Sequence, residues 1–126
     1  MTLHSLPIFV RLSGRAVILV GEGEAAAAKR RLLERAGAVI LTESERPASP
    51  GDDPRLAIVV DDEPAVARLK ARGILVNAVD RPELCDFTLP AIVDRNPVLV
   101  AIGTGGASAG LAAALRQRLE ALLPMN

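Results

Sequence analysis

Short apolar runs recur along the chain, separated by longer stretches that mix charged residues with alanine and leucine. Each run holds five or six residues, is rich in Val, Ile and Leu, and stops at a glycine or an acidic residue, which is typical of β-strands. The first run lacks any alternation of polar and apolar positions, so we expect it to be buried on both faces, as in a parallel sheet. The predicted strands are residues 15–20, 38–42, 55–60, 74–79 and 97–102.

The stretches between these runs predict helices, with one exception. Residues 24–36 (EAAAAKRRLLERA) are rich in strong helix formers and stop at a glycine. Residues 64–72 begin with proline after an acidic segment, and residues 108–123 follow a glycine-rich turn and end before a proline. Residues 44–54 hold three prolines, a glycine and several charges, which favours a loop.

The order of these elements predicts the fold class. Strands that alternate with helices form right-handed βαβ units around a parallel sheet. A chain of 126 residues, half of them apolar, can bury one modest core. We therefore expect an α/β protein with one domain and at most a small appendage.

The amino-acid composition limits which binding partners and which cellular compartment are expected. Fifteen basic residues balance fifteen acidic ones, and Trp and Tyr are absent, so no nucleic-acid partner is expected. No apolar run approaches the roughly 20 residues that cross a bilayer. Cys85 is the single cysteine and the N-terminus lacks a secretory pattern, which favours a cytoplasmic protein. No cluster of Cys and His predicts a metal site.

A glycine-rich motif stands between the first predicted strand and the first predicted helix. It fits G-x-G-x-x-A in the context that a dinucleotide fingerprint requires, with glycines for the tight turn and for close approach to a pyrophosphate. Glu43 lies 22 residues after Gly21, about where a carboxylate accepts hydrogen bonds from the adenosine ribose, which favours NAD over NADP. The candidate cofactor-binding residues of this motif are Gly21, Glu22, Gly23, Glu24 and Ala25, with Glu43 beyond it.

A purely structural interpretation of the same motif stays open, because glycines also make tight turns between strands and helices. Glu22 and Glu24 complement the positive end of a helix dipole but would repel a pyrophosphate.

Two further segments carry candidate chemistry. Asn77 to Asp80 stands at the end of the fourth strand, at the edge where open α/β sheets bind ligands, and Asp80 is a candidate proton acceptor or simply a turn cap. Thr104 to Gly110 offers backbone amides and a helix N-terminus to an anion, or is only a turn. His4 is expected to be solvated, and Cys85 to be a packing residue.

Taken together, these segments resemble the precorrin-2 dehydrogenase and sirohydrochlorin ferrochelatase family, the module found alone or at the N-terminus of siroheme synthase. The resemblance spans nearly the whole chain. It is carried by Leu6 to Phe9, Gly21, Gly23, Ala26, Lys29, Leu32, Leu33, residues 36–38, Asn77, Asp80, Phe87, Pro90, residues 92–95, Pro97, residues 104–106 and Ser108.

The resemblance implies a Rossmann-like fold, a parallel sheet with helices on both faces, over residues 1–88. A short strand-helix dimerisation segment over residues 89–126 implies a homodimer. The implied reaction is NAD-dependent dehydrogenation of precorrin-2 to sirohydrochlorin, with iron insertion in bifunctional members. Asp80 would be the general base and Asp61 would face the cofactor at the end of a strand. Asn77, Thr104, Gly105, Gly106 and Ser108 would border the tetrapyrrole.

Departures from the family pattern keep a second hypothesis open. About fifteen residues are missing between the second and third predicted strands, Glu22 replaces a fingerprint glycine, and Asp61 replaces a threonine. The alternative is a non-catalytic dimeric relative that acts as a binding or regulatory module. An unrelated NAD-binding subunit is a third, weaker interpretation.

Overall fold

The computed structural model describes residues 1–125, which form two compact units. One unit is Pro7–Phe87, and the other joins Met1–Leu6 to the chain from Thr88 onward. Each unit has its own elements, and each is described by itself.

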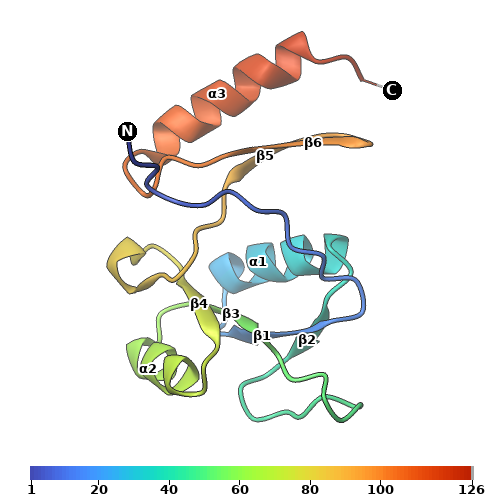
Figure 1. Cartoon of the computed structure of the whole chain (residues 1–126), viewed down its shortest axis with the longest axis vertical. Coiled ribbons are helices and arrows are strands. Elements are labelled where there is room, and N and C mark those ends of the chain that lie inside the picture. Colours follow the sequence, from blue (N-terminus) through green and yellow to red (C-terminus); the bar gives the residue numbers. More distant parts are fainter. Residues whose placement is uncertain (126) are drawn as a thin grey trace. The chain divides into compact units, whose positions relative to one another are not determined.

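The larger unit is built on a four-stranded parallel sheet in the order β2-β1-β3-β4 (Figure 1). At its centre Ile18 is in register with Leu41 on one side and Ala57 on the other. Residues of the central strands are almost wholly buried, as expected for apolar runs covered on both faces. The strands are β1 (Ala16–Val20), β2 (Val39–Leu41), β3 (Leu56–Val59) and β4 (Leu75–Ala78).

Two helices cover this sheet on opposite faces (Figure 1). Helix α1 (Glu24–Arg35) contacts β1 and β2, whereas α2 (Glu63–Ala71) contacts β3 and β4. Helix α2 begins where the Asp62 carboxylate accepts a hydrogen bond from the Ala65 amide at 3.0 Å. Its apolar face places Leu69, which is fully buried, in the core. A short 3-10 turn, η1 (Pro82–Leu84), follows β4.

The smaller unit is an antiparallel hairpin with one helix. Strand β5 (Ala91–Arg95) pairs with β6 (Val98–Ile102), and α3 (Ala109–Leu122) packs on the hairpin. Val93 is fully buried beneath the helix. The Arg95 guanidinium donates to the carbonyl oxygens of Glu120 and Leu123, at 3.0 and 3.5 Å, where α3 ends.

The predicted fold class is confirmed. The run at 97–102 forms a strand of the C-terminal hairpin, outside the parallel sheet, within the strand-helix segment predicted over residues 89–126. Its partner, residues 91–95, was not predicted as a strand, because a strand that pairs with its sequence neighbour depends on the turn between them more than on its own composition. Residues 44–54 contain neither helix nor strand, as predicted. Within residues 1–125 no helix is long and apolar enough to span a membrane.

Candidate functional site

The carboxyl ends of β1, β3 and β4 lie at one edge of the parallel sheet. The chain leaves β1 for β2 on one side and returns to β3 on the other, so the connections diverge between β1 and β3. Open α/β sheets bind ligands in the crevice at such a switch point. The residues that follow the three strands are therefore the candidates for chemistry: Gly21–Glu24, Asp61–Glu63 and Asp80–Arg81.

Gly21 sits where the backbone of the next strand comes very close. A Cβ at this position would lie 2.7 Å from Val60 Cβ and 2.8 Å from the Val60 carbonyl oxygen. Its φ of +121° is also a conformation that other residues rarely adopt. The first glycine of the motif is thus required by the turn itself, which fits the structural interpretation as well as the functional one.

Gly23 differs from Gly21, because a Cβ there would meet open space. It is the N-cap of α1, with φ +88°, and no side chain caps the helix. The amides of the first turn are therefore available to a bound anion. Ala26 is buried, and the Glu24 carboxylate pairs with Arg31 at 2.9 Å, which offsets part of the negative charge beside this helix end. Glu22 and Ala25 are exposed.

Glu43 is engaged by helix α2. Its carboxylate accepts from Arg68 Nε at 2.7 Å and from Arg68 Nη2 at 2.9 Å, and its carbonyl oxygen accepts from Arg72 Nη1 at 3.3 Å. The hydrogen bonds from Arg68 hold the pKa of the Glu43 carboxyl below its ordinary value. A carboxylate has about four lone-pair directions, so about two remain open to other donors.

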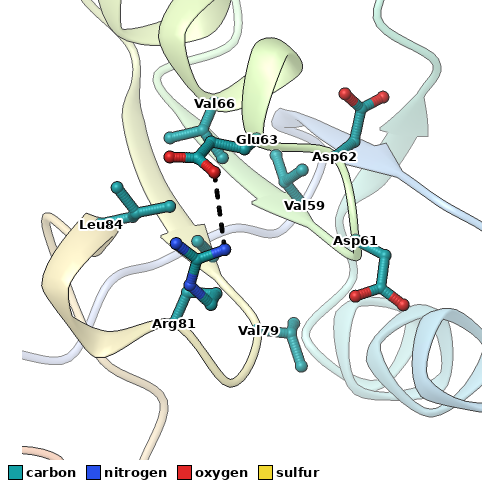
Figure 2. Close-up of a pocket in the computed structure, with 9 residues that line it drawn as sticks. Val59, Asp61, Asp62, Glu63, Val66, Val79, Arg81 and Leu84 are labelled. Carbon is teal, nitrogen blue, oxygen red and sulfur yellow. Dashed lines mark ion pairs between the residues drawn. The ribbon is translucent and has the colours of Figure 1, made fainter.

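Two aspartates at adjacent strand ends adopt left-handed backbone conformations. Asp61 has φ +52° and Asp80 φ +61°, and they are the two non-glycine residues with positive φ among residues 1–125. Such conformations cost about 1–2 kcal/mol and cluster at functional sites. Asp61 borders a cavity of about 270 Å³ between α2, β4 and η1. Figure 2 shows an ion pair beside it, 3.6 Å long, between Glu63 and Arg81.

Strand β4 is an edge strand whose free side is covered by the segment that follows η1. Asp86 Oδ2 accepts from the Val76 amide at 2.9 Å, and the Asp86 amide donates to the Val76 carbonyl at 2.8 Å. Asn77, 7% exposed, donates from Nδ2 to the Phe87 carbonyl at 2.9 Å. These bonds satisfy polar groups that an uncovered edge would leave unpaired. The structure therefore gives Asn77 a structural partner, and its contact with a tetrapyrrole stays a prediction.

The turn from Thr104 to Ser108 belongs to the smaller unit. Thr104 Oγ1 accepts from the Ser108 amide at 3.1 Å, and Ser108 Oγ caps α3 by accepting from the Leu111 amide at 3.0 Å. Gly105 and Gly106 both have positive φ. The His4 ring lies against Gly105, where a Cβ would come within 2.9 Å of Nδ1, so His4 packs on this turn although it is exposed.

The structure thus brings some of the predicted residues together. The first-strand turn, Asp61 and Asp80 share one edge of the sheet, whereas Glu43 is joined to α2 and the Thr104–Ser108 turn lies in the other unit. Sequence reasoning missed Arg68 and the bonding role of Cys85. An arginine 25 residues from Glu43 carries no local signal of that pairing.

These features define the class: a Rossmann-like α/β domain with an uncapped glycine-rich turn at its switch point. A family model described as "Putative NAD(P)-binding" matches residues 52–91, from the loop before β3 to the start of β5. The chain is 41% identical to siroheme synthase 2 of Cronobacter sakazakii, and 39% identical to the siroheme synthase of Thiobacillus denitrificans, over 96% and 97% of its length. The predicted resemblance to the precorrin-2 dehydrogenase module of siroheme synthases is confirmed.

The chain spans only about a third of these relatives, 32% and 31% of their lengths. The alignment with the Cronobacter protein extends over 147 positions, more than the 126 residues of this chain, so that relative carries residues that are missing here. Among solved structures, the precorrin-2 dehydrogenase SirC matches with a TM-score of 0.70 at 21% identity, over 95% of this chain and 72% of SirC. This likeness shows a shared fold.

Proposed function

We propose that the protein catalyses the NAD-dependent dehydrogenation of precorrin-2 to sirohydrochlorin. The observation that carries this proposal is that one edge of the sheet holds both the uncapped turn at Gly23 and Asp80, whose backbone is left-handed. It is supported by the identity to siroheme synthases over nearly the whole chain and by the fold shared with a precorrin-2 dehydrogenase.

The residues at the switch point fit a dinucleotide. Space lies beside Gly23, the amides of the first turn of α1 have no capping side chain, and Ala26 is small enough for the helix to pack closely on the sheet. We assign the pyrophosphate to this helix end, the adenosine ribose to Glu43, and the side of the cofactor nearest β3 to Asp61. Glu22, with its carboxylate at the same helix end, lowers the affinity.

NAD would supply, when bound, the acceptor for the hydride that precorrin-2 loses. The dehydrogenation also releases a proton, and we assign its acceptance to the Asp80 carboxylate. Asp80 is exposed and lies two residues beyond the end of β4, with a left-handed backbone, at the carboxyl edge of the sheet. Asn77, Thr104, Gly105, Gly106 and Ser108 would contact the tetrapyrrole. Two copies of the chain would form a homodimer in the cytoplasm through residues 89–126.

Replacing Asp80 with Asn tests the assignment of the base. Asn is nearly isosteric but cannot accept a proton, so turnover of precorrin-2 should fall at least about 100-fold while NAD affinity and stability are kept. Asp53→Asn, an exposed change in the loop before β3, is the matched control and should keep full turnover. If Asp80→Asn retains wild-type turnover, the base lies elsewhere.

The non-catalytic alternative is favoured by two observations, the carboxylate of Glu22 at the helix end and the missing residues between β2 and β3. A scaffold of this kind would keep its fold without responding to NAD. Thermal unfolding with and without millimolar NAD separates the two, because a ligand that binds only the folded state at a hundredfold excess over Kd stabilises it by about 2.7 kcal/mol. Iron insertion would be assayed separately, with sirohydrochlorin and ferrous iron.

A further inference from the structure

We propose that Cys85 is a positioning residue for Asp80, which it holds by clamping the turn that follows β4. This inference rests on the proposed function for its catalytic consequence, and on geometry alone for the clamp. The thiol lies in the half-buried segment just beyond η1, seven residues from Ala78 and four from Arg81.

The Cys85 thiol reaches both ends of the turn. Its sulfur accepts from the Ala78 amide at 3.2 Å and faces the carbonyl oxygens of Ala78 at 3.2 Å and Arg81 at 3.4 Å. The single S–H donates to one of these carbonyls at a time. Ala78 and Arg81 are the residues on either side of the Val79–Asp80 pair, so the sulfur spans the segment that carries the carboxylate.

Asp80 needs such support because its own backbone is strained. A left-handed conformation persists in a residue with a side chain only where the surroundings impose it. One restraint is the bond from the Arg81 amide to the Ala78 carbonyl at 3.1 Å, which closes the turn. The thiol is the second restraint on the same two residues. The Arg81 side chain is tied separately to Glu63 and Glu83.

The rate of proton transfer depends more on the position of the general base than on the stability of the turn that carries it. A displacement of about 1 Å can cost on the order of 100-fold in rate. Removal of the thiol should therefore reduce kcat more than it changes KM, because the thiol bonds the backbone on either side of Asp80. A purely structural role would lower stability and leave kcat per folded molecule unchanged.

The test compares Cys85→Ala, Cys85→Ser and Asp86→Ala. Asp86→Ala is the matched control, since it removes a similar bond on the free side of β4, at Val76, without touching the turn. Steady-state kcat and KM would be measured with amide hydrogen exchange at Ala78 and Arg81. Cys85→Ala should reduce kcat at least tenfold. It should also raise the rate of hydrogen exchange at both amides at least tenfold. Cys85→Ser keeps a hydrogen-bond donor and acceptor, so it should recover most of the lost kcat and most of the protection from exchange. Asp86→Ala should keep the wild-type kcat.

Three results would overturn the inference. One is an unchanged kcat in Cys85→Ala, the second is equal loss of kcat in Asp86→Ala, and the third is unaltered exchange at Ala78 and Arg81. A wild-type protein without turnover would contradict the proposed function instead. The exchange comparison would then still decide whether Cys85 clamps the turn.

Discussion

The Glu43 carboxylate is bound side-on by the Arg68 guanidinium, through Nε at 2.7 Å and Nη2 at 2.9 Å. This pair joins the segment after β2 to helix α2, across residues that the sequence places 25 positions apart. In the proposed function the same carboxylate accepts hydrogen bonds from the ribose hydroxyls of NAD. Arg68 therefore fixes the orientation of the acceptor before any cofactor arrives, which is a form of preorganisation.

The pair predicts a pH dependence of stability. Arg68 holds the Glu43 pKa below its ordinary value of 4.5, so the folded state binds the proton less readily than the unfolded state. The contribution is complete above pH 4.5 and is lost as the pH falls through the lowered pKa. Glu43→Gln should thus reduce Tm by roughly 1–4 °C at pH 7 and by less in acid. Thermal unfolding from pH 3 to 7 measures this, and a Tm difference that grows in acid would contradict it.

Gly21 is predicted to be intolerant of any side chain. Gly21→Ala would press a Cβ against Val60, and should cost about 2–4 kcal/mol of unfolding free energy. Gly23 has φ +88° and ψ −171°, a conformation almost confined to glycine, but a Cβ there meets open space. Gly23→Ala should therefore cost less than Gly21→Ala, about 1–3 kcal/mol from backbone strain alone. Urea unfolding gives the free energy of unfolding of both variants. The difference between them is the cost of the steric contact with Val60 beyond backbone strain. Equal losses would show that the approach of Val60 is not close in solution.

Arg95 is predicted to stabilise the end of α3. Arg95→Ala removes the donors to Glu120 and Leu123 and should destabilise the smaller unit by about 1–3 kcal/mol. Arg118→Ala, an exposed change on the same helix, should cost less than about 0.5 kcal/mol. Hydrogen exchange in the last turn of α3 would report the difference directly. Similar protection in the two variants would mean that Arg95 does not hold the helix end.

Asp61 offers a test of backbone strain at the sheet edge. Because its φ is +52°, Asp61→Gly should keep or raise stability by up to about 1 kcal/mol, whereas Asp61→Thr should lower it, since β-branched residues disfavour this conformation. Chemical denaturation of both variants tests this predicted order of stability. If Asp61→Thr is the more stable, the left-handed conformation is not the one adopted in solution.

The strands and helices of the larger unit could be predicted because local composition determines them. The runs that become β1, β3 and β4 are apolar and end at glycine or aspartate, and these ends already marked the candidate site. Pairing between distant segments could not be predicted in the same way. Neither the bond from Arg68 to Glu43 nor the pairing of β5 with β6 leaves a periodic trace in the sequence.

Cys85 shows the same limit at a single residue. A small apolar side chain beside Asp86 suggested packing, and the residue is in fact half-buried. Its three backbone contacts depend on η1 turning the chain back onto β4, which composition does not reveal. Asp80, in contrast, could be named as a candidate from its place just beyond the end of a strand, and its role stays a prediction.

Calorimetric titration of the purified protein with NAD at low millimolar concentration would show whether this shortened domain still binds the dinucleotide. We expect saturable binding that is weakened at least tenfold in Gly23→Asp, which adds a third carboxylate at the α1 N-terminus. The unfolding transition should also shift to higher temperature with NAD. If the wild-type protein gives neither heat nor a thermal shift, NAD binding is refuted and the domain is a scaffold without this cofactor.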